Sequence, residues 1–129
     1  MKSYTDLEQS KKLAEILPIE SADMWWAERY AGQVMANGQY IVEEKPVYYL
    51  SLTKPSDGNY SQDTVKDIPC WSLAALLAVL DEPYLFKKFN TWSCYVFNPN
   101  NHRFISTDSA EPVDACVDMV IKLHEQKLL

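Results

Sequence analysis

The chain has 129 residues, with 18 acidic and 12 basic side chains and a formal net charge of -6 at neutral pH. This length suits one domain with its own hydrophobic core, so we expect a single domain over residues 1–129. The basic residues are scattered and the charge balance is acidic, which disfavours contact with a nucleic-acid backbone.

The first predicted element is a helix over residues 5–17. Thr5 and Glu8 have the spacing of a capping box, and Pro18 would end the helix. The next segment, residues 21–35, is predicted to be either a helix or a strand. Its apolar residues recur at helical spacing, but its bulky start suits a strand.

Two short strands are predicted next, over residues 40–42 and 47–53. The second is rich in aromatic and β-branched side chains, and Pro46 precedes it. A polar, turn-rich stretch over residues 54–63 follows. It separates these strands from the most apolar part of the chain.

That apolar part, residues 69–80, predicts a central helix. Ser72 is its only hydrophilic residue. A helix that is apolar all round must be covered on every side or lie in a membrane. The run is shorter than the roughly 20 apolar residues that span a bilayer. We therefore expect a buried central helix that begins at Pro69, with Cys70 in its first turn, and no membrane contact.

A β-hairpin and a helix are predicted at the C-terminal end. Residues 93–97 and 102–107 flank an Asn-Pro-Asn-Asn turn, which is typical of a hairpin. The last helix is expected to start within residues 108–112. Its predicted inner side consists of Val113, Cys116, Val117, Val120, Leu123 and His124.

These elements together predict the fold class. We expect an α+β domain in which a small, mostly antiparallel sheet packs against the buried central helix and the amphipathic C-terminal helix.

Cys70 is the candidate nucleophile, because the N-terminal end of a helix lowers the pKa of a thiol. Residues 69–74 resemble the start of the nucleophile helix in papain-like cysteine enzymes. In such an enzyme His102 would act as the general base, and Asp108 or Asn101 would orient it. The alternative function is therefore a cysteine hydrolase or transferase that uses Cys70, His102 and Asp108.

Two features of the sequence weigh against that enzyme. Papain-like enzymes carry glycines around the nucleophile, whereas Ile68 and Pro69 stand here. A buried cysteine that fills space in the core is also the commoner case. The sequence thus favours a non-enzymatic role over catalysis.

The sequence predicts neither a metal nor a cofactor. Cys70, Cys94 and Cys116 are far apart, and the close ligand pairs of zinc sites are missing. Asp114 and Asp118 share one face of the last helix, where solvated carboxylates are usual, and Lys122 would pair with Asp118. Free thiols and the lack of an apolar leader at the N-terminus predict a cytoplasmic protein.

Aromatic residues are the remaining functional signal. Most of them are expected in the core, but exposed Tyr and Trp side chains are favoured anchors of protein interfaces. Neighbouring residues of a strand point to opposite faces, so at least one of Tyr48 and Tyr49 should be exposed. The interface candidates are Trp25, Tyr48, Tyr49 and Tyr60, and the expected partner is another protein or a second copy of the chain.

Three segments also resemble a known family. Residues 68–77, residues 111–124 and the shorter residues 20–24 are similar to small proteins of prophages and other mobile elements from gut bacteria. That family has no assigned activity, so the resemblance assigns no site residue. It implies a cytoplasmic accessory protein of a bacterial mobile element, and it favours a strand for the start of the undecided segment.

Overall fold

The computed structural model describes residues 1–34, 36–53 and 67–129. Within these residues the chain forms three α-helices, one 3₁₀ turn and six strands. The strands form two antiparallel sheets of three strands each. The predicted α+β domain is therefore confirmed, with its strands divided between two sheets.

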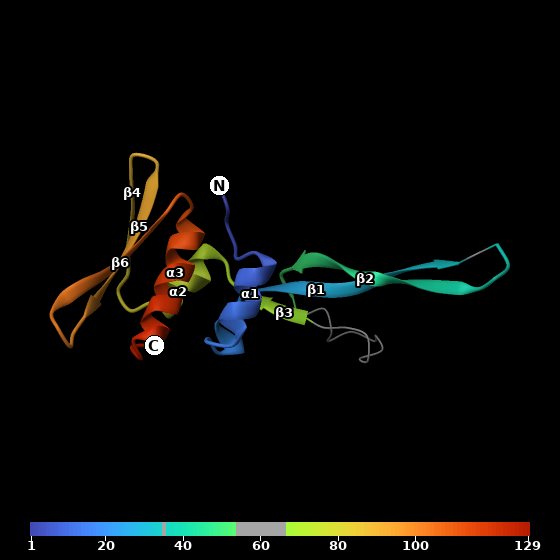
Figure 1. The fold of residues 1–129 in the computed structure, drawn as a ribbon, viewed down its shortest axis with the longest axis horizontal. Coiled ribbons are helices and arrows are strands. Elements are labelled where there is room, and N and C mark those ends of the chain that lie inside the picture. The colour runs from blue at the N-terminus through green and yellow to red at the C-terminus, as the bar shows by residue number, and fades with distance from the viewer. Residues whose placement is uncertain (35, 54–66) are drawn as a thin grey trace.

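The first sheet has the order β2-β1-β3 and contains β1 (Met24–Val34), β2 (Tyr40–Ser51) and β3 (Asp67–Cys70). The long β1–β2 hairpin extends away from the helices (Figure 1). The undecided segment over residues 21–35 is thus mainly a strand, and the two short strands predicted around Pro46 are one. Pro46 fits there because β2 is an edge strand of the described sheet, where a missing N–H is tolerated.

The second sheet has the order β4-β5-β6 and contains β4 (Tyr84–Lys88), β5 (Thr91–Asn98) and β6 (Arg103–Ser109). The predicted hairpin is confirmed as β5–β6. Its turn is fixed by two asparagine side chains: Asn98 accepts from the N–H of Asn100, and Asn101 accepts from the N–H of Arg103.

The helix α3 (Pro112–Glu125) packs against one face of the second sheet. Alternate residues of β5 and β6 point toward it, among them the buried Cys94, Val96 and Ile105. Most of the predicted inner side of the helix is buried, but His124 is exposed and does not belong to it. The other face of the sheet points away from α3, at one end of the molecule (Figure 1).

The helix α2 (Leu73–Val79) is shorter than the predicted central helix. The predicted start at Pro69 is wrong, because Pro69 and Cys70 belong to β3 and pair with β1. Ser72 caps the helix by accepting from the N–H of Ala75. The helix is not covered on every side either, since Ala74 and Ala78 are exposed. Small alanine side chains leave little apolar surface where the helix meets solvent.

The helix α1 (Leu7–Ala14) begins two residues later and ends three residues earlier than the predicted range 5–17. Asp6 is its N-cap and forms a capping box with Gln9. Thr5 does not cap the helix. It is fully buried, shares a hydrogen bond with the hydroxyl of Ser10, and accepts from the N–H of Trp71.

Among the described residues, no helix is both long enough and apolar enough to cross a membrane.

Candidate functional site

Cys70 lies at the end of β3, and its side chain is fully buried. Its thiol donates to the carbonyl of Thr5 and accepts from the hydroxyl of Thr5, with both contacts at 3.4 Å. Burial raises the pKa of the Cys70 thiol, although the hydrogen bonds from Thr5 and Ser10 act in the opposite direction. The thiol is therefore neutral at physiological pH and shielded from any substrate.

The other members of the alternative triad lie elsewhere. His102 is exposed in the β5–β6 turn, with its ring 6.2 Å from the ring of Phe97. Asp108 accepts from the hydroxyl of Ser93 at 2.6 Å. His102 and Asp108 are six residues apart along an extended chain, so their backbones are separated by about 20 Å. The structure does not bring Cys70, His102 and Asp108 together.

The remaining cysteines are core residues. Cys94 on β5 and Cys116 on α3 are fully buried, and both are free thiols. Hydrogen bonding to Cys94 and burial raise the pKa of Cys116. The described residues contain no group of three or more His, Cys, Asp or Glu side chains that could hold a metal ion.

The carboxylates of α3 do not form a catalytic pair. Asp114 accepts from the ammonium of Lys2 and from the amide of Gln9, both at 2.7 Å. Burial, followed by the nearby charge of Asp114, raises the pKa of Asp118. Lys122 donates to the carbonyl of Ser106. Asp114 is thus part of the packing between α1, α3 and the N-terminal residues.

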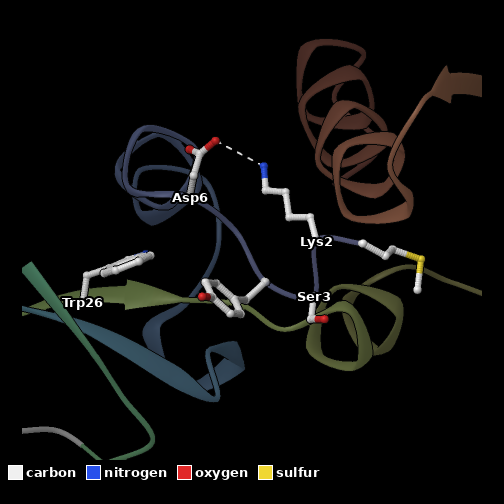
Figure 2. Close-up of a pocket in the computed structure, with 6 residues that line it drawn as sticks. Lys2, Ser3, Asp6 and Trp26 are labelled. Atoms are coloured by element: carbon white, nitrogen blue, oxygen red, sulfur yellow. Dashed lines mark hydrogen bonds and ion pairs between the residues drawn. The ribbon is translucent and has the colours of Figure 1, made fainter.

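A cavity of about 330 Å³ lies beside that packing (Figure 2). Its lining includes Tyr4 and Trp26, whose rings meet edge to face at 5.9 Å. Among the described residues that line it, Lys2 is the only one with a cationic side chain, and its ammonium donates to Asp6, Gln9 and Asp114. An ammonium has three protons to donate, so Lys2 has none left for a ligand. We therefore interpret this region as structural.

The predicted interface residues lie on the first sheet, except for Tyr60, which is outside the described residues. Tyr49 is 56% exposed, while Tyr48 is half-buried with the ammonium of Lys11 5.9 Å from its ring centre. Trp25 is half-buried and pairs with Ser51. The register places Trp25 and Tyr49 on one face of this sheet and Tyr48 on the other.

A larger group of exposed rings lies on the second sheet. We define the aromatic face as Tyr84, Phe86, Tyr95, Phe97 and Phe104. The pairing register puts all five on the side of the sheet opposite to the buried Cys94 and Val96. Four of them are between 41% and 60% exposed, and Tyr95 is half-buried at the centre.

The rings of the aromatic face contact one another. Phe86 stacks on Tyr95 with ring centres 5.3 Å apart. Phe104 meets three other rings edge to face: Phe97 at 5.4 Å, Tyr84 at 6.0 Å and Tyr95 at 6.3 Å. Tyr84, Phe86, Tyr95 and Phe104 also line an open hollow of about 270 Å³. The face is therefore a continuous apolar surface with a shallow pocket at its centre.

The apolar pattern of residues 91–98 in the sequence indicates this face, although the interface prediction does not include it. Residues 91–98 alternate two apolar sets, Trp92, Cys94 and Val96 on one side and Tyr95 and Phe97 on the other. A strand that is apolar on both sides must be covered on both or expose one. The interface candidates predicted from the sequence are all Tyr and Trp residues, so they do not include the phenylalanines of this face.

No family model matches the chain, and no curated protein or solved structure is significantly similar to it.

Proposed function

We propose that this protein is a non-enzymatic protein-interaction module that binds its partner through the aromatic face. The observation that carries the proposal is the cluster of exposed, mutually contacting rings on the open side of the second sheet. Aromatic residues are enriched at the centres of protein interfaces, where they bury large areas at a small cost in side-chain entropy.

The energetics of the face support a binding role. An exposed aromatic ring costs free energy in water at about 25 cal/mol for each Å² of apolar surface. Soluble monomers rarely leave more than a few hundred Å² of contiguous apolar surface open unless that surface is used. Binding of a partner that covers the face would remove this apolar surface from water and would therefore be favourable.

The charges around the face favour a protein partner over a nucleic acid. Lys88 follows Phe86 by two residues on the same side of β4, and Glu82 borders the opposite end of the face beside Tyr84. Asp108 on β6 lies on the side of the sheet that carries the aromatic face, and it accepts a hydrogen bond from the hydroxyl of Ser93. Stacking of nucleobases on aromatic rings is normally accompanied by a basic surface, and these charges are mixed in sign.

The cellular setting of the proposal comes from the resemblance and from the cysteines. The resemblance of residues 68–77 and 111–124 to small proteins of mobile elements implies an accessory role in the cytoplasm of a bacterium, and this setting is part of the proposal. Three free cysteines are compatible with a reducing compartment. The alternative of a cysteine hydrolase or transferase has no support from the geometry, because Cys70 is buried away from His102.

The test is photo-crosslinking inside the cells that carry the gene. A benzophenone amino acid replaces Phe97, which is 45% exposed on the aromatic face. We expect a discrete protein adduct on illumination, to be identified by mass spectrometry. Absence of any discrete adduct from this position would overturn the proposal.

The matched control places the same amino acid at Leu52. This residue is 77% exposed and follows β2 of the first sheet, away from the aromatic face. It should give no adduct of the same mass. An identical pattern of adducts from Leu52 and Phe97 would show random collision instead of docking.

A further inference from the structure

The charges at the two ends of β4 point to a specific occupant of the aromatic face. We infer that it is a second copy of this chain, packed face to face about a two-fold axis that crosses the strands. This inference rests on the proposed function and names the partner for the same surface. In the pair, β4 of one copy lies antiparallel across β4 of the other.

The first argument is charge complementarity. Asp81 and Glu82 precede β4 and border the aromatic face beside Tyr84 and Phe97, while Lys88 ends the strand. All three are exposed. An antiparallel arrangement places the acidic start of one β4 over the basic end of its partner, twice in each dimer. A closed two-fold pair is also the commonest form of oligomer, because the same patch serves both copies.

The alternative two-fold axis, parallel to the strands, would place Lys88 over β6 of the partner. Asp108 there could pair with Lys88, but Asp81 and Glu82 would then face the start of β6. Arg103 at the other end of β6 belongs to the alternate set of side chains, with the buried Ile105. The aromatic face thus has opposite charges at both ends only along β4, among the strands described here.

The second argument is area. Phe89 is 88% exposed, and its ring centre lies 6.0 Å from the ammonium of Lys88, which is on the same side of β4 as Phe86. Phe89 and the aromatic face together leave about 600 Å² open if a fully exposed aromatic residue presents roughly 200 Å². Two copies would then bury about 1,200 Å², near the lower limit of specific interfaces. The expected dimer is accordingly weak, with a dissociation constant of about 1–100 µM.

The hollow at the centre of the face suits such packing. It is lined by four rings and measures about 270 Å³. A ring from the facing copy can enter it, as interdigitating side chains do between packed sheets. The shape of the face and its charges therefore favour the same arrangement.

Sedimentation equilibrium of the purified full chain across the micromolar range tests the inference. We expect a reversible monomer–dimer equilibrium that Phe104→Ser weakens at least about tenfold, since Phe104 contacts three other rings of the face. Tyr49→Ser is the matched control, because Tyr49 is 56% and Phe104 55% exposed. The control should leave the equilibrium unchanged.

Charge reversal tests the arrangement without touching a ring. Glu82→Lys and Lys88→Glu should each weaken self-association about fivefold, since each replaces attraction by repulsion twice per dimer. Mixing the two variants should restore dimers, because every facing pair is then opposite in charge. Failure to recover on mixing would overturn the antiparallel arrangement.

The outcomes separate this inference from the proposed function. A strict monomer at all concentrations, or a dimer that is insensitive to Phe104→Ser, overturns the second copy as occupant. A crosslink from Phe97 to a different protein would then still support the proposed function. A crosslink between two copies of this chain in the cell supports both.

Discussion

The buried position of Cys70 follows from the residues around it. Trp71 donates its backbone N–H to the hydroxyl of Thr5 and its indole N–H to the hydroxyl of Ser21. The carbonyl of Trp71 accepts from the N–H of Thr5. These bonds hold the N-terminal residues over the end of β3, so the thiol of Cys70 is enclosed. A thiol in such a place acts as a small apolar group.

We predict that iodoacetamide leaves Cys70 unmodified in the folded protein at neutral pH. Burial raises the pKa of the thiol, and its side chain has no contact with solvent. Peptide mapping by mass spectrometry should find the adduct only after denaturant is added, together with the equally buried Cys94 and Cys116. Rapid and selective labelling of Cys70 under native conditions would contradict this interpretation and revive the cysteine enzyme.

Among the elements, the β4–β5 turn combines exposure with an unusual backbone. Phe89 follows Lys88 in this short turn and has a φ of 58°. Positive φ angles are costly for a bulky side chain and are usually left to Gly, Asn or Asp. A large ring that is kept exposed in such a position fits a binding role better than a structural one.

We predict that Phe89→Asn raises the free energy of unfolding by up to about 1 kcal/mol, because asparagine tolerates this backbone conformation. Urea denaturation followed by fluorescence measures the change. The same variant should weaken self-association, since an exposed ring beside the aromatic face is lost. A loss of stability would show that Phe89 supports the fold.

The elements also show where the sequence was informative and where it was not. The β5–β6 hairpin was predictable because its asparagine and proline turn is a local signal. Residues 67–70 were not, because their strand exists only through pairing with β1, a contact between distant parts of the chain. The apolar run from Pro69 looks continuous in the sequence, but Ser72 divides it into a strand and a helix by capping the latter.

At the scale of the whole molecule, the sequence predicted one sheet, whereas the residues that the structure describes form two. Local patterns identify strands but do not state which strands pair. The position of the aromatic face depends on that pairing, because Phe97 and Phe104 become neighbours only through the β5–β6 register. Of the predicted interface residues, Trp25, Tyr48 and Tyr49 belong to the other sheet.

The N-terminal residues connect the parts of this molecule. Ser3 accepts from the N–H of Leu73 at the start of α2, and the backbone N–H of Lys2 donates to Glu111 beside α3. The ammonium of Lys2 reaches both Asp6 and Asp114. This segment therefore joins α1, α2 and α3, and its charges should contribute to the stability of the whole fold.

We predict that Lys2→Met lowers the free energy of unfolding by about 1 kcal/mol at neutral pH, as expected for a partly buried charge with several hydrogen bonds. Burial disfavours both charges, but the bonds to Asp114 and Asp6 raise the pKa of Lys2 above its usual 10.5. The N–H of Gln9 and the ammonium of Lys2 likewise hold the pKa of Asp6 below its usual 3.8. The contribution of these two charges to the free energy of unfolding is therefore complete between pH 3.8 and pH 10.5. It is lost as the pH falls below 3.8, and it is lost again as the pH rises above 10.5.

Thermal and urea unfolding across the pH range measure this dependence. The difference between the native protein and Lys2→Met should shrink in acid, because Asp6 is then protonated and no longer attracts Lys2. Lys11→Met is the matched control: its ion pair with Glu8 is 3.9 Å long and largely exposed, so its removal should have little effect. An equal loss from both variants would show that the ion pairs of Lys2 have no special role. A loss that persists unchanged in acid would mean that Lys2 acts through hydrogen bonds to neutral acceptors such as Gln9 and that the charge of Asp6 does not matter.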